Sequence, residues 1–557
     1  MLFYDFEVFK HDWLVVVFDT EERKEHVIVN DIERLNNFYQ KHNKDVWIGY
    51  NSRHYDQYVM KAILAGFTPQ EMNDWIINKK KPGWKFSNAL FKIKFYNFDI
   101  MIGFNSLKQL EAFMGHDIQE TTVSFDIERK LTDEELEQVI FYCRHDVMET
   151  MQVFKNRVEE YTSQMALLKA FDLSLKNISK TKAQLSAIIL NSQNNTDRTD
   201  EMNFSFPDTL DINKYSDVIS FYKNTNDYKD KLEIEVAGVP HIFAWGGLHG
   251  ARKNYCEEGY FVNVDVESYY PALMIEYDYG SRNIKDANKY RKIRDTRLKL
   301  KAKKDPNQAP YKIVLNSTYG AMKDRYNGLY DPRQANNVCI AGMTLLLDLI
   351  EKLEPHCDII QSNTDGVLVK LRKESDFELI DDICYEWEQR TRMVLEFDVY
   401  KKVIQKDVNN YIVVDHDGNY KSKGAYVKKL NELDNDLPIL NKALINYFIH
   451  SIPVEETINT CTELIMFQKV VKISSKYEYA VYGQRRQSEK VFRVFASKSE
   501  NDKELKKVKD GSHSKIAYTP DKCFIDNGDI LNKKIPSKLD RAWYVDMANK
   551  RIKDFIG

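Results

Sequence analysis

Two carboxylates, Asp5 and Glu7, stand two residues apart in the alternating segment 2–9. Alternation of apolar and polar residues predicts a β-strand, and its period of two places both carboxylates on the same face. Carboxylates held so close repel each other unless a divalent cation neutralises them. The segment therefore predicts a metal-binding strand, with solvated strand-end acids as the alternative.

Two later segments supply further groups for the same chemistry. Segment 46–58 predicts a strand that runs into Asp56 at the start of a helix, and segment 136–147 has a helical period that places Tyr142 and Asp146 on one face. Four carboxylates and one tyrosine are the components of a two-metal nuclease, in which the cations bind the scissile phosphate and the tyrosine orients the attacking water. Taken alone, each segment is also compatible with solvated acids or with a tyrosine stacked on a helix.

A second candidate metal site lies in segment 261–274. Its first residues predict a short apolar strand, and Pro271 ends that strand in a turn followed by a helix. Asp265 at the strand end is the metal-ligand candidate, the Val266 carbonyl can add a ligand, and the Tyr270 ring can wall a substrate pocket. The alternative is an ordinary buried strand with one solvated aspartate.

Two basic helices follow, over 289–304 and 310–320. The short interval between them predicts an antiparallel hairpin. One face of each helix is cationic or polar: Arg294, Arg297 and Lys301 on the first, and Lys312, Asn316 and Tyr319 on the second. Facing cationic stripes repel each other unless an anion lies between them, so the hairpin predicts a polyphosphate site, with a nucleoside triphosphate as the candidate. A solvated basic surface is the alternative.

Three further stretches carry candidate residues. Gly246 and Gly247 allow close backbone approach to a phosphate, although a plain glycine turn has the same composition. Apolar runs on either side of a polar turn predict a hairpin that presents Asp365. A basic turn with Lys421 and Lys423 suits backbone phosphates.

Segments 2–9, 46–58 and 136–147 resemble the three motifs of the proofreading 3′–5′ exonuclease domain of DNA polymerases. That domain is a ribonuclease-H-like α/β fold. Segments 98–100 and 106–110 also look like connecting segments of that domain. The resemblance implies a pair of bound Mg²⁺ ions and a water oriented by Tyr142. The implied metal ligands are Asp5, Glu7, Asp56 and Asp146. Asn51 and Tyr55 are implied contacts to the single strand, and Val8 stands where relatives often have threonine.

Three downstream segments resemble motifs A, B and C of family B DNA polymerases. They read Asp265-x-x-Ser-x-Tyr-Pro271, Lys312-x-x-x-Asn-Ser-x-Tyr-Gly320 and Thr364-Asp365. With the exonuclease motifs ahead of them, the resemblance covers roughly residues 1–430, in the order that the family has. Two positions depart from the family: Asn363 stands where motif C usually has its first aspartate, and Tyr269 where motif A usually has leucine.

The polymerase resemblance implies a second two-metal site, in which Asp265, the Val266 carbonyl and Asp365 bind two Mg²⁺ ions, with Mn²⁺ as a substitute. The residues that it implies for the incoming dNTP are Tyr270, which would exclude a 2′-hydroxyl, together with Arg294, Arg297, Lys312 and Asn316. The residues that it implies for DNA are Gly246, Gly247, Tyr319, Gly320, Lys406, Tyr411, Lys421 and Lys423. Of these, Lys406 and Tyr411 resemble the family's Lys-x-Tyr element at a wider spacing.

The expected fold class is α/β and α+β multidomain, with a ribonuclease-H-like exonuclease domain followed by a right-hand polymerase of palm, fingers and thumb. The expected boundaries are 1–155 for the exonuclease domain, 156–240 for a helical linker region, 241–284 and 324–430 for the palm, 285–323 for the fingers hairpin, and 431–557 for the thumb and C-terminal segment. The last of these is expected to be helical, with basic patches.

The composition argues against a membrane-spanning or disulfide-rich protein. Of 557 residues, 43% are hydrophobic and 30% are charged, and the net charge is −3. No apolar run approaches the roughly 18 residues of a membrane span, and no signal-peptide pattern begins the chain. Seven scattered cysteines without CxxC pairs indicate free thiols in a reducing cytoplasm.

We therefore expect a compact family B DNA polymerase with 3′–5′ proofreading, of bacteriophage or plasmid type. It would act in the cytoplasm of a bacterial host on primer–template DNA and dNTPs, beside replisome proteins such as a helicase and a single-strand-binding protein. Since the first exonuclease motif begins at Asp5, we expect the extra N-terminal domain of larger members to be absent. The first alternative is a DNA-binding exonuclease with a decayed polymerase site, suggested by Asn363 and opposed by Asp265, Lys312 and Asp365. The second is an RNA-directed or primase-like activity, which Tyr270 opposes.

Overall fold

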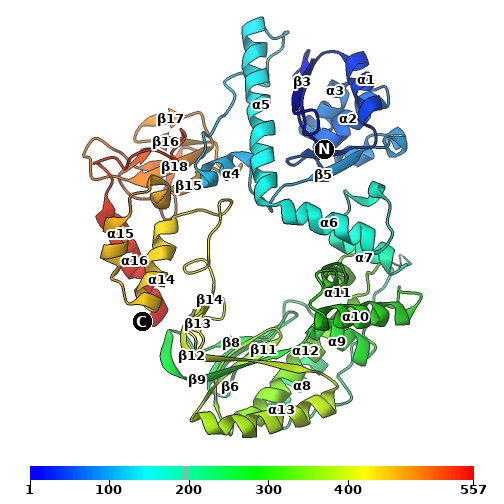
Figure 1. Ribbon diagram of the computed structural model, residues 1–557, viewed down its shortest axis with the longest axis vertical. Coiled ribbons are helices and arrows are strands. Elements are labelled where there is room, and N and C mark those ends of the chain that lie inside the picture. Colours follow the sequence, from blue (N-terminus) through cyan, green and yellow to red (C-terminus); the bar gives the residue numbers. More distant parts are fainter. Residues whose placement is uncertain (194, 196) are drawn as a thin grey trace. The chain divides into compact units, whose positions relative to one another are not determined.

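The computed structural model describes residues 1–193, 195 and 197–557 (Figure 1). The chain forms two compact units, and neither is one continuous segment. The first unit comprises Met1–Ser179, Leu430–Ala443 and Pro453–Met547, and the second comprises Lys180–Lys429, Leu444–Ile452 and Ala548–Gly557. Helices and strands are mixed in both units, and each unit has its own sheets.

The first unit is built on a five-stranded sheet in the order β3-β2-β1-β4-β5. The strands are β1 (Leu2–Val8), β2 (Trp13–Asp19), β3 (Lys24–Val29), β4 (Val46–Gly49) and β5 (Tyr96–Asp99). Strand β1 is the middle strand, antiparallel to β2 and parallel to β4. The predicted strands at 2–9 and 46–49 are both present.

The middle strand β1 is covered on both faces, and side chains of different kinds point to the two faces. Its even-numbered side chains, among them Tyr4 and Phe6, belong to a buried aromatic and aliphatic core that also contains Trp47. Its odd-numbered side chains face the long helix α5 (Asp133–Asn156), because Phe3 packs edge-on against Phe154 at 5.2 Å between ring centroids. Asp5 and Glu7 share that second face.

The N-terminal part of the first unit also contains α-helices. They are α1 (Ile32–His42), α2 (Asp56–Leu64), α3 (Pro69–Asn73), α4 (Leu107–Met114), α5 and α6 (Val158–Ala170). Helix α5 begins at a capping box made by Thr132 and Glu135, with three acidic residues in its first turn that complement the helix dipole. The predicted helix over 136–147 lies within α5.

The C-terminal part of the first unit is mostly β-structure, so the expectation of a helical segment over 431–557 is wrong for its middle. Seven strands form a three-stranded sheet, β15-β18-β21, and a four-stranded sheet, β17-β16-β19-β20. They are β15 (Lys469–Lys472), β16 (Tyr479–Tyr482), β17 (Arg485–Gln487), β18 (Val491–Ala496), β19 (Leu505–Lys509), β20 (Ser512–Lys515) and β21 (Cys523–Ile525). The physical reason is that β18 is rich in valine and phenylalanine and buried at every position, a composition that favours a central strand.

Arg493 joins this β-structure to α4 within the first unit. Its side chain is fully buried and donates to the backbone carbonyls of Ala112 and His116, at 3.1 and 2.8 Å. It also donates to the carbonyl of Gly528 at 2.7 Å. Burial lowers the pKa of Arg493 to about 10, and the carbonyl dipoles compensate the buried charge.

The second unit is built on a nine-stranded sheet in the order β14-β13-β12-β9-β11-β10-β8-β7-β6. The strands are β6 (Leu232–Val236), β7 (Val239–Phe243), β8 (His249–Ala251), β9 (Tyr255–Val266), β10 (Asp358–Asn363), β11 (Gly366–Leu371), β12 (Leu395–Asp407), β13 (Asn410–Val414) and β14 (Tyr420–Lys423). The predicted hairpin that presents Asp365 is the antiparallel pair β10–β11. Strand β9 lies between β11 and β12, so the end of the predicted 261–274 strand is central to the sheet.

The helices of the second unit include the predicted basic hairpin. They are α7 (Lys182–Ile189), α8 (Ser216–Asn224), α9 (Tyr269–Glu276), α10 (Ala287–Ala302), α11 (Gln308–Lys323), α12 (Pro332–Leu353) and α13 (Phe377–Thr391). Helices α10 and α11 pack together, and the Tyr290 hydroxyl donates to the Leu315 carbonyl at 2.9 Å (Figure 1). Helix α12 is buried along most of its length, and Trp387 of α13 donates to its Leu345 carbonyl at 3.2 Å.

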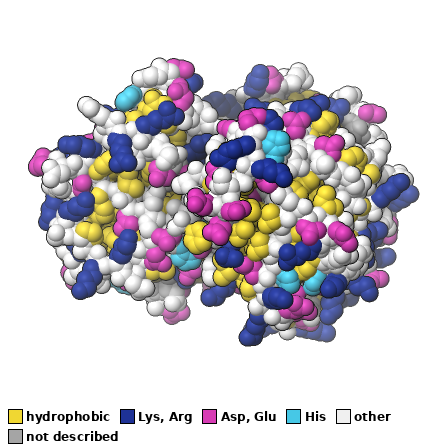
Figure 2. All heavy atoms as spheres, turned by 90° about the horizontal axis from the view of Figure 1, so that it is seen from above, with side chains coloured by type: hydrophobic (Ala, Val, Ile, Leu, Met, Phe, Trp, Pro, Cys, Tyr) yellow, Lys and Arg dark blue, Asp and Glu magenta, His cyan; other side chains and the backbone are white. Residues whose placement is uncertain are grey.

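The remaining helices are α14 (Pro438–His450), α15 (Val454–Thr460) and α16 (Arg541–Ile556). Among the residues that the structure describes, no helix combines the length and apolar character needed to span a bilayer. Each of the seven cysteines is a free thiol. On the face drawn in Figure 2, Lys and Arg side chains lie among Asp and Glu side chains, which agrees with the small net charge of −3.

Candidate functional site

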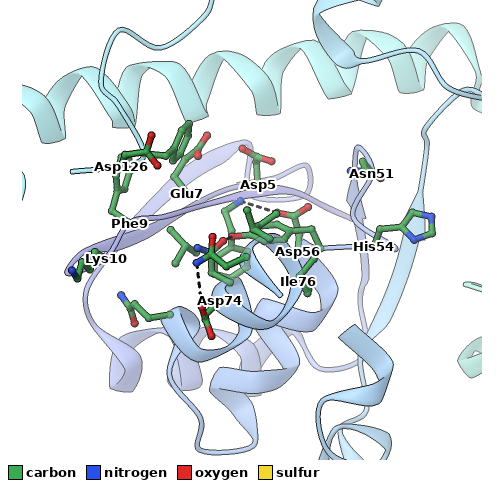
Figure 3. Close-up of a pocket in the computed structure, with 18 of the residues that line it drawn as sticks. Asp5, Glu7, Phe9, Lys10, Asn51, His54, Asp56, Asp74, Ile76 and Asp126 are labelled. Carbon is green, nitrogen blue, oxygen red and sulfur yellow. Dashed lines mark hydrogen bonds between the residues drawn. The ribbon is translucent and has the colours of Figure 1, made fainter. Parts of the chain in front are cut away.

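The first site forms where β1, α2 and α5 meet in the first unit. Asp5 and Glu7 project from one side of β1, and Asp56 is the first residue of α2 (Figure 3). The Asp56 Oδ1 accepts the backbone N–H of Phe6 at 3.1 Å, which fixes α2 against β1 between the two carboxylates. Asp146 of α5 lines the same pocket, so the structure brings together all four carboxylates that the sequence predicted.

The four carboxylates repel one another strongly. Burial raises the pKa of Asp5 well above its usual value, and the charges of Asp56 and Glu7 add to this shift. Burial also raises the pKa of Glu7 well above its usual value, and the charge of Asp146 adds to that shift. Burial raises the pKa of Asp56 to about 7 and that of Asp146 to about 6. A cluster that resists ionisation in this way is stabilised by a divalent cation.

Tyr142 and Lys108 lie on the α5 side of this cluster. Burial and then Asp146 raise the pKa of Tyr142 far above its usual value, so its hydroxyl stays protonated. The Lys108 Nζ lies 4.5 Å from the centroid of the Tyr142 ring and donates to Asp146 at 2.5 Å and to Glu111 at 3.0 Å. The sequence prediction missed Lys108, although it lies in segment 106–110, and its spacing of three from Glu111 is typical of a helical ion pair.

A pocket of about 860 Å³ opens beside the carboxylates. Asn51 and Tyr55, the predicted single-strand contacts, both line it. Asn51 has a positive φ of 58°, a strained conformation that aspartate and asparagine tolerate better than most residues. The Tyr55 hydroxyl donates to the Asn73 Oδ1 at 2.7 Å, which holds its ring at the pocket wall.

The donor set fits hard divalent cations. The ligand atoms of Asp5, Glu7 and Cys143 lie within 4.8 Å of one another. Burial raises the pKa of the Cys143 thiol well above its usual value, and its Sγ donates to the Asp5 carbonyl at 3.3 Å. The thiol therefore acts as a hydrogen-bond donor, and carboxylate oxygens remain as the ligands that Mg²⁺ or Mn²⁺ prefers.

The second site forms at the end of β9 in the second unit. Asp265 pairs across the sheet with Gly366, the first residue of β11. The Val266 N–H donates to the Asp365 carbonyl at 2.8 Å, so the β10–β11 turn lies directly against the end of β9. Burial and then Asp365 raise the pKa of Asp265 to about 6, which again indicates two carboxylates with uncompensated charge and fits an oxygen-bound divalent cation.

A pocket of about 570 Å³ contains this second carboxylate pair. The predicted residues that line it are Asp265, Val266, Tyr270, Arg297, Lys312, Asn316 and Asp365. Lys301, which the sequence places on the same helix face as Arg297, also lines the pocket and pairs with Glu267 and Glu396 at 2.5 and 2.9 Å. Arg294 is not among the described residues that line this pocket. Its side chain turns to α9 and pairs with Glu276 at 2.7 Å.

Arg297 is the cation best placed to receive an anionic ligand. Its side chain is 6% exposed, and one Nη1–H donates to the Ser268 Oγ at 2.5 Å. Within the described part of the chain, its buried Nε has no hydrogen-bond partner. A buried guanidinium with an unused donor, together with Lys312, fits the phosphate groups of a nucleotide.

Tyr270 forms the apolar wall of this pocket. Its ring lies 4.4 Å from the ring of Tyr319 on α11, at an interplanar angle of 48°. Tyr269 also lines the pocket, and its hydroxyl donates to the Gly342 carbonyl of α12 at 2.8 Å. Gly320 has open space around its Cα, so the helix surface beside Tyr319 is accessible to a ligand.

Asn363 lies at the edge of the second site, at the end of β10, which pairs with β11 on one side and β8 on the other. It pairs with His249 of β8 in the sheet register; burial lowers the pKa of His249, and the Asn363 side chain opposes that shift. Burial raises the pKa of Tyr411 of β13, and the Asn363 side chain opposes that shift. Lys423 of β14 lies 6.0 Å from the Tyr411 ring. The sequence analysis missed His249, for which the only signal was its position after the glycine pair.

The remaining predicted DNA contacts are two glycines and two lysines. Gly247 lies against Thr364, where a β-carbon would come within 2.8 Å of the threonine hydroxyl, and Gly246 is open on its Cα side. Lys406 instead lies over the Tyr426 ring at 4.6 Å. Lys421 pairs with Asp398 at 2.8 Å.

The chain is similar in structure to a solved DNA polymerase. It is the family B DNA polymerase from the hyperthermophilic archaeon Pyrobaculum calidifontis, with 13% sequence identity and a TM-score of 0.44. The comparison covers 100% of this chain and 77% of that chain. The chain matches no protein-family profile and no curated protein.

Proposed function

We propose that the protein is a template-directed DNA polymerase of family B type with a 3′–5′ proofreading exonuclease. The observation that carries this proposal is the pair of separate carboxylate centres, each in its own unit and each with its own pocket. Four carboxylates with a tyrosine suit hydrolysis of a terminal phosphodiester. Two carboxylates that face Arg297 and Lys312 suit transfer of a nucleotide from a triphosphate.

In this proposal the first unit contains a ribonuclease-H-like exonuclease domain, and the second contains the palm and the fingers hairpin of a right-hand polymerase. The thumb would lie within the C-terminal part of the chain. The setting that we propose is the replication of a phage or plasmid genome in the bacterial cytoplasm, with a helicase and a single-strand-binding protein as partners. This setting rests on the motif resemblance.

At the polymerase site, Asp265, the Val266 carbonyl and Asp365 would hold two Mg²⁺ ions. When bound, such ions neutralise developing negative charge and lower the pKa of the primer 3′-hydroxyl. Arg297 and Lys312 bind the triphosphate oxygens, and Ser268 orients Arg297 through its hydrogen bond. The Tyr270 ring supports the sugar and leaves no space for a 2′-hydroxyl.

At the exonuclease site, the four carboxylates would hold a second pair of Mg²⁺ ions. The protonated Tyr142 hydroxyl hydrogen-bonds the attacking water and orients it toward the terminal phosphate. Lys108 keeps Asp146 ionised and in place through their ion pair. Asn51 and Tyr55 hold the last nucleotides of the strand in the pocket.

A second candidate function is favoured by Asn363. Replacing one aspartate of motif C removes a charge from the polymerase site, as expected for an exonuclease whose polymerase site has decayed. Asp265, Asp365 and Lys312 are nevertheless together in one pocket, which favours an active polymerase.

One experiment separates the two functions. The full-length protein is incubated with a primer–template and dNTPs, and in parallel with a 5′-labelled single strand without dNTPs, in Mg²⁺ and in EDTA. We expect extension of the primer and 3′–5′ shortening of the single strand, both only with Mg²⁺. Shortening without any extension would favour the decayed polymerase. The absence of both reactions would overturn the proposal.

A further inference from the structure

A surface beside the exonuclease pocket combines lysines with exposed aromatic rings. It comprises residues 75–94, which follow α3, and we call it the lysine–aromatic surface. Its six lysines are Lys79, Lys80, Lys81, Lys85, Lys92 and Lys94, and no acidic residue occurs from Trp75 to Phe98. All six are exposed, so the segment is a concentrated positive charge on a chain whose net charge is −3.

Nearly all of this charge is uncompensated. Among the described residues, Lys79 is the one lysine of the six that forms an ion pair, with Asp74 at 2.7 Å. Lys81 and Lys85 lie instead over aromatic rings, at 4.4 Å from the centroid of Trp75 and 5.0 Å from that of Trp84. An ammonium group above an aromatic ring is attracted to the ring face and keeps its charge.

Large apolar side chains on this surface are open to solvent. Trp84 is 50% exposed and Phe91 is 70% exposed. Trp75 anchors the surface, since it packs edge-on against Phe86 at 5.7 Å and donates to the Pro82 carbonyl at 3.1 Å. The backbone at Gly83 packs closely on Tyr58, since a β-carbon there would lie 2.4 Å from the Tyr58 ring.

The lysine–aromatic surface is continuous with the exonuclease pocket. Ile76, Ile77 and Asn78 belong to its first turn and line the same pocket as Asp5 and Asp56. Figure 3 shows Ile76 next to Asp56. A strand whose 3′ end lies at the carboxylates can therefore continue onto the lysines and rings without leaving the first unit.

We propose that the lysine–aromatic surface binds single-stranded DNA, namely the nucleotides that precede the 3′ end held in the exonuclease pocket. Fixed lysines match the phosphate backbone, and exposed tryptophan and phenylalanine rings stack with bases of any sequence. This inference rests on the proposed exonuclease function and assigns that function a longer substrate site. The site would favour long strands over short ones.

Binding is measured in EDTA, so that no strand is digested, by fluorescence anisotropy of 5′-labelled oligothymidylate of about 12 and about 3 nucleotides. The variants are Trp84→Ala and the triple substitution Lys80→Ala, Lys81→Ala, Lys85→Ala. Trp84→Ala is expected to weaken binding of the longer strand about 10-fold, since one stacking contact is lost. The triple variant is expected to reduce the slope of log affinity against log salt by about 2, since each phosphate contact contributes about 0.7.

Two controls test whether the effect belongs to this surface. Lys24, Lys41 and Lys44 are exposed in the same unit, and replacing all three by alanine makes the same change in net charge. This control triple is expected to keep the wild-type affinity and salt slope. Trp84→Phe keeps a ring and is expected to recover most of the affinity that Trp84→Ala loses, with unchanged thermal unfolding in every variant.

Digestion in Mg²⁺ is measured on the same two strands. The wild type is expected to have a lower KM for the longer strand, and the surface variants are expected to lose that preference. If the wild type digests neither strand, the proposed exonuclease function fails, while the binding measurement still decides whether the surface holds DNA. If the wild type digests both strands and the surface variants match the control triple in binding and in KM, the inference is wrong.

Discussion

Gly366 lies directly across the sheet from Asp265, and a β-carbon at position 366 would lie 1.8 Å from the Asp265 Oδ1. It would also lie 3.0 Å from the Val264 carbonyl oxygen, which belongs to the backbone and cannot move away. Any side chain at this position must therefore displace the Asp265 carboxylate. The glycine is what permits that carboxylate to lie beside the β10–β11 turn and Asp365.

Gly366→Ala is expected to impair DNA synthesis selectively. A displacement of about 1 Å in a metal ligand costs on the order of 100-fold in rate, so nucleotide incorporation should fall by about that factor. Digestion of a single strand should not change, because the exonuclease carboxylates lie in the other unit. Gly280→Ala is the matched control, since a β-carbon there would meet nothing closer than 3.9 Å. Equal incorporation rates for the two variants would contradict this account of Gly366.

The two active sites are expected to be separable by mutation. Asp265→Ala should abolish nucleotide addition and retain 3′–5′ digestion, whereas Asp5→Ala should do the reverse, because the two aspartates belong to different units. Both activities are measured on each purified variant, with circular dichroism to show that it is folded. A folded variant that lost both activities would contradict the assignment of one site to each unit.

Tyr270→Val is expected to admit ribonucleotides. Removal of the ring opens space beside Tyr319 and beneath the sugar, so the preference for dATP over ATP should fall by about 10- to 200-fold. Tyr270→Phe keeps the ring and should keep the preference. Single-nucleotide incorporation on a template thymidine measures both ratios, and an unchanged ratio for Tyr270→Val would show that another group excludes the 2′-hydroxyl.

Asn363 is expected to support the site without binding metal directly. Its side chain lies close enough to His249 and Tyr411 to act on the pKa of each, which suits a neutral amide that can both donate and accept hydrogen bonds. Asp365→Asn should cost several orders of magnitude in rate, because it removes a ligand of both cations. Asn363→Asp should change the rate by about tenfold or less, which is about 1.4 kcal/mol in the barrier. Incorporation is measured against Mg²⁺ concentration, and an inert wild type that Asn363→Asp restores would favour the decayed-polymerase alternative.

The metal-free protein is expected to lose stability as the pH rises from about 4 to about 7. Burial raises the pKa values of the exonuclease carboxylates in the folded state, to about 7 for Asp56 and about 6 for Asp146. Over this window the unfolded state binds fewer protons than the folded state, so the free energy of unfolding falls with pH. Below about pH 4 both states are protonated and the carboxylates contribute no difference.

Mg²⁺ should reverse this loss, because it replaces the protons that the carboxylates release. Thermal unfolding of the first unit is measured across the window with EDTA and with Mg²⁺. Asp56→Asn should flatten the pH dependence in EDTA and reduce the stabilisation by Mg²⁺. A stability in EDTA that is constant or rises from pH 4 to 7 would contradict the charge state inferred for this cluster.

The sequence alone determined which side chains could do chemistry and on which local faces they lie. The spacing of Asp5 and Glu7 requires one strand face, and the spacing of Tyr142 and Asp146 requires one helix face, whatever surrounds them. The strands, the hairpin at Asp365 and the basic helix pair followed in the same way, because period and turn composition are local properties. The structure has each of these elements at its predicted place.

The tertiary structure decided which of those side chains meet and which groups tune them. Lys108 pairs with Asp146, 38 residues later in the sequence, and Arg294 turns from the triphosphate pocket to Glu276. His249 and Tyr411 reach Asn363 only because β8 and β13 belong to the same sheet. The β-structure of residues 469–525, read from the sequence as helical, packs on α4 through the buried Arg493. Periodicity assigns a residue to a face, but long-range packing selects its partners, and no local pattern encodes that choice.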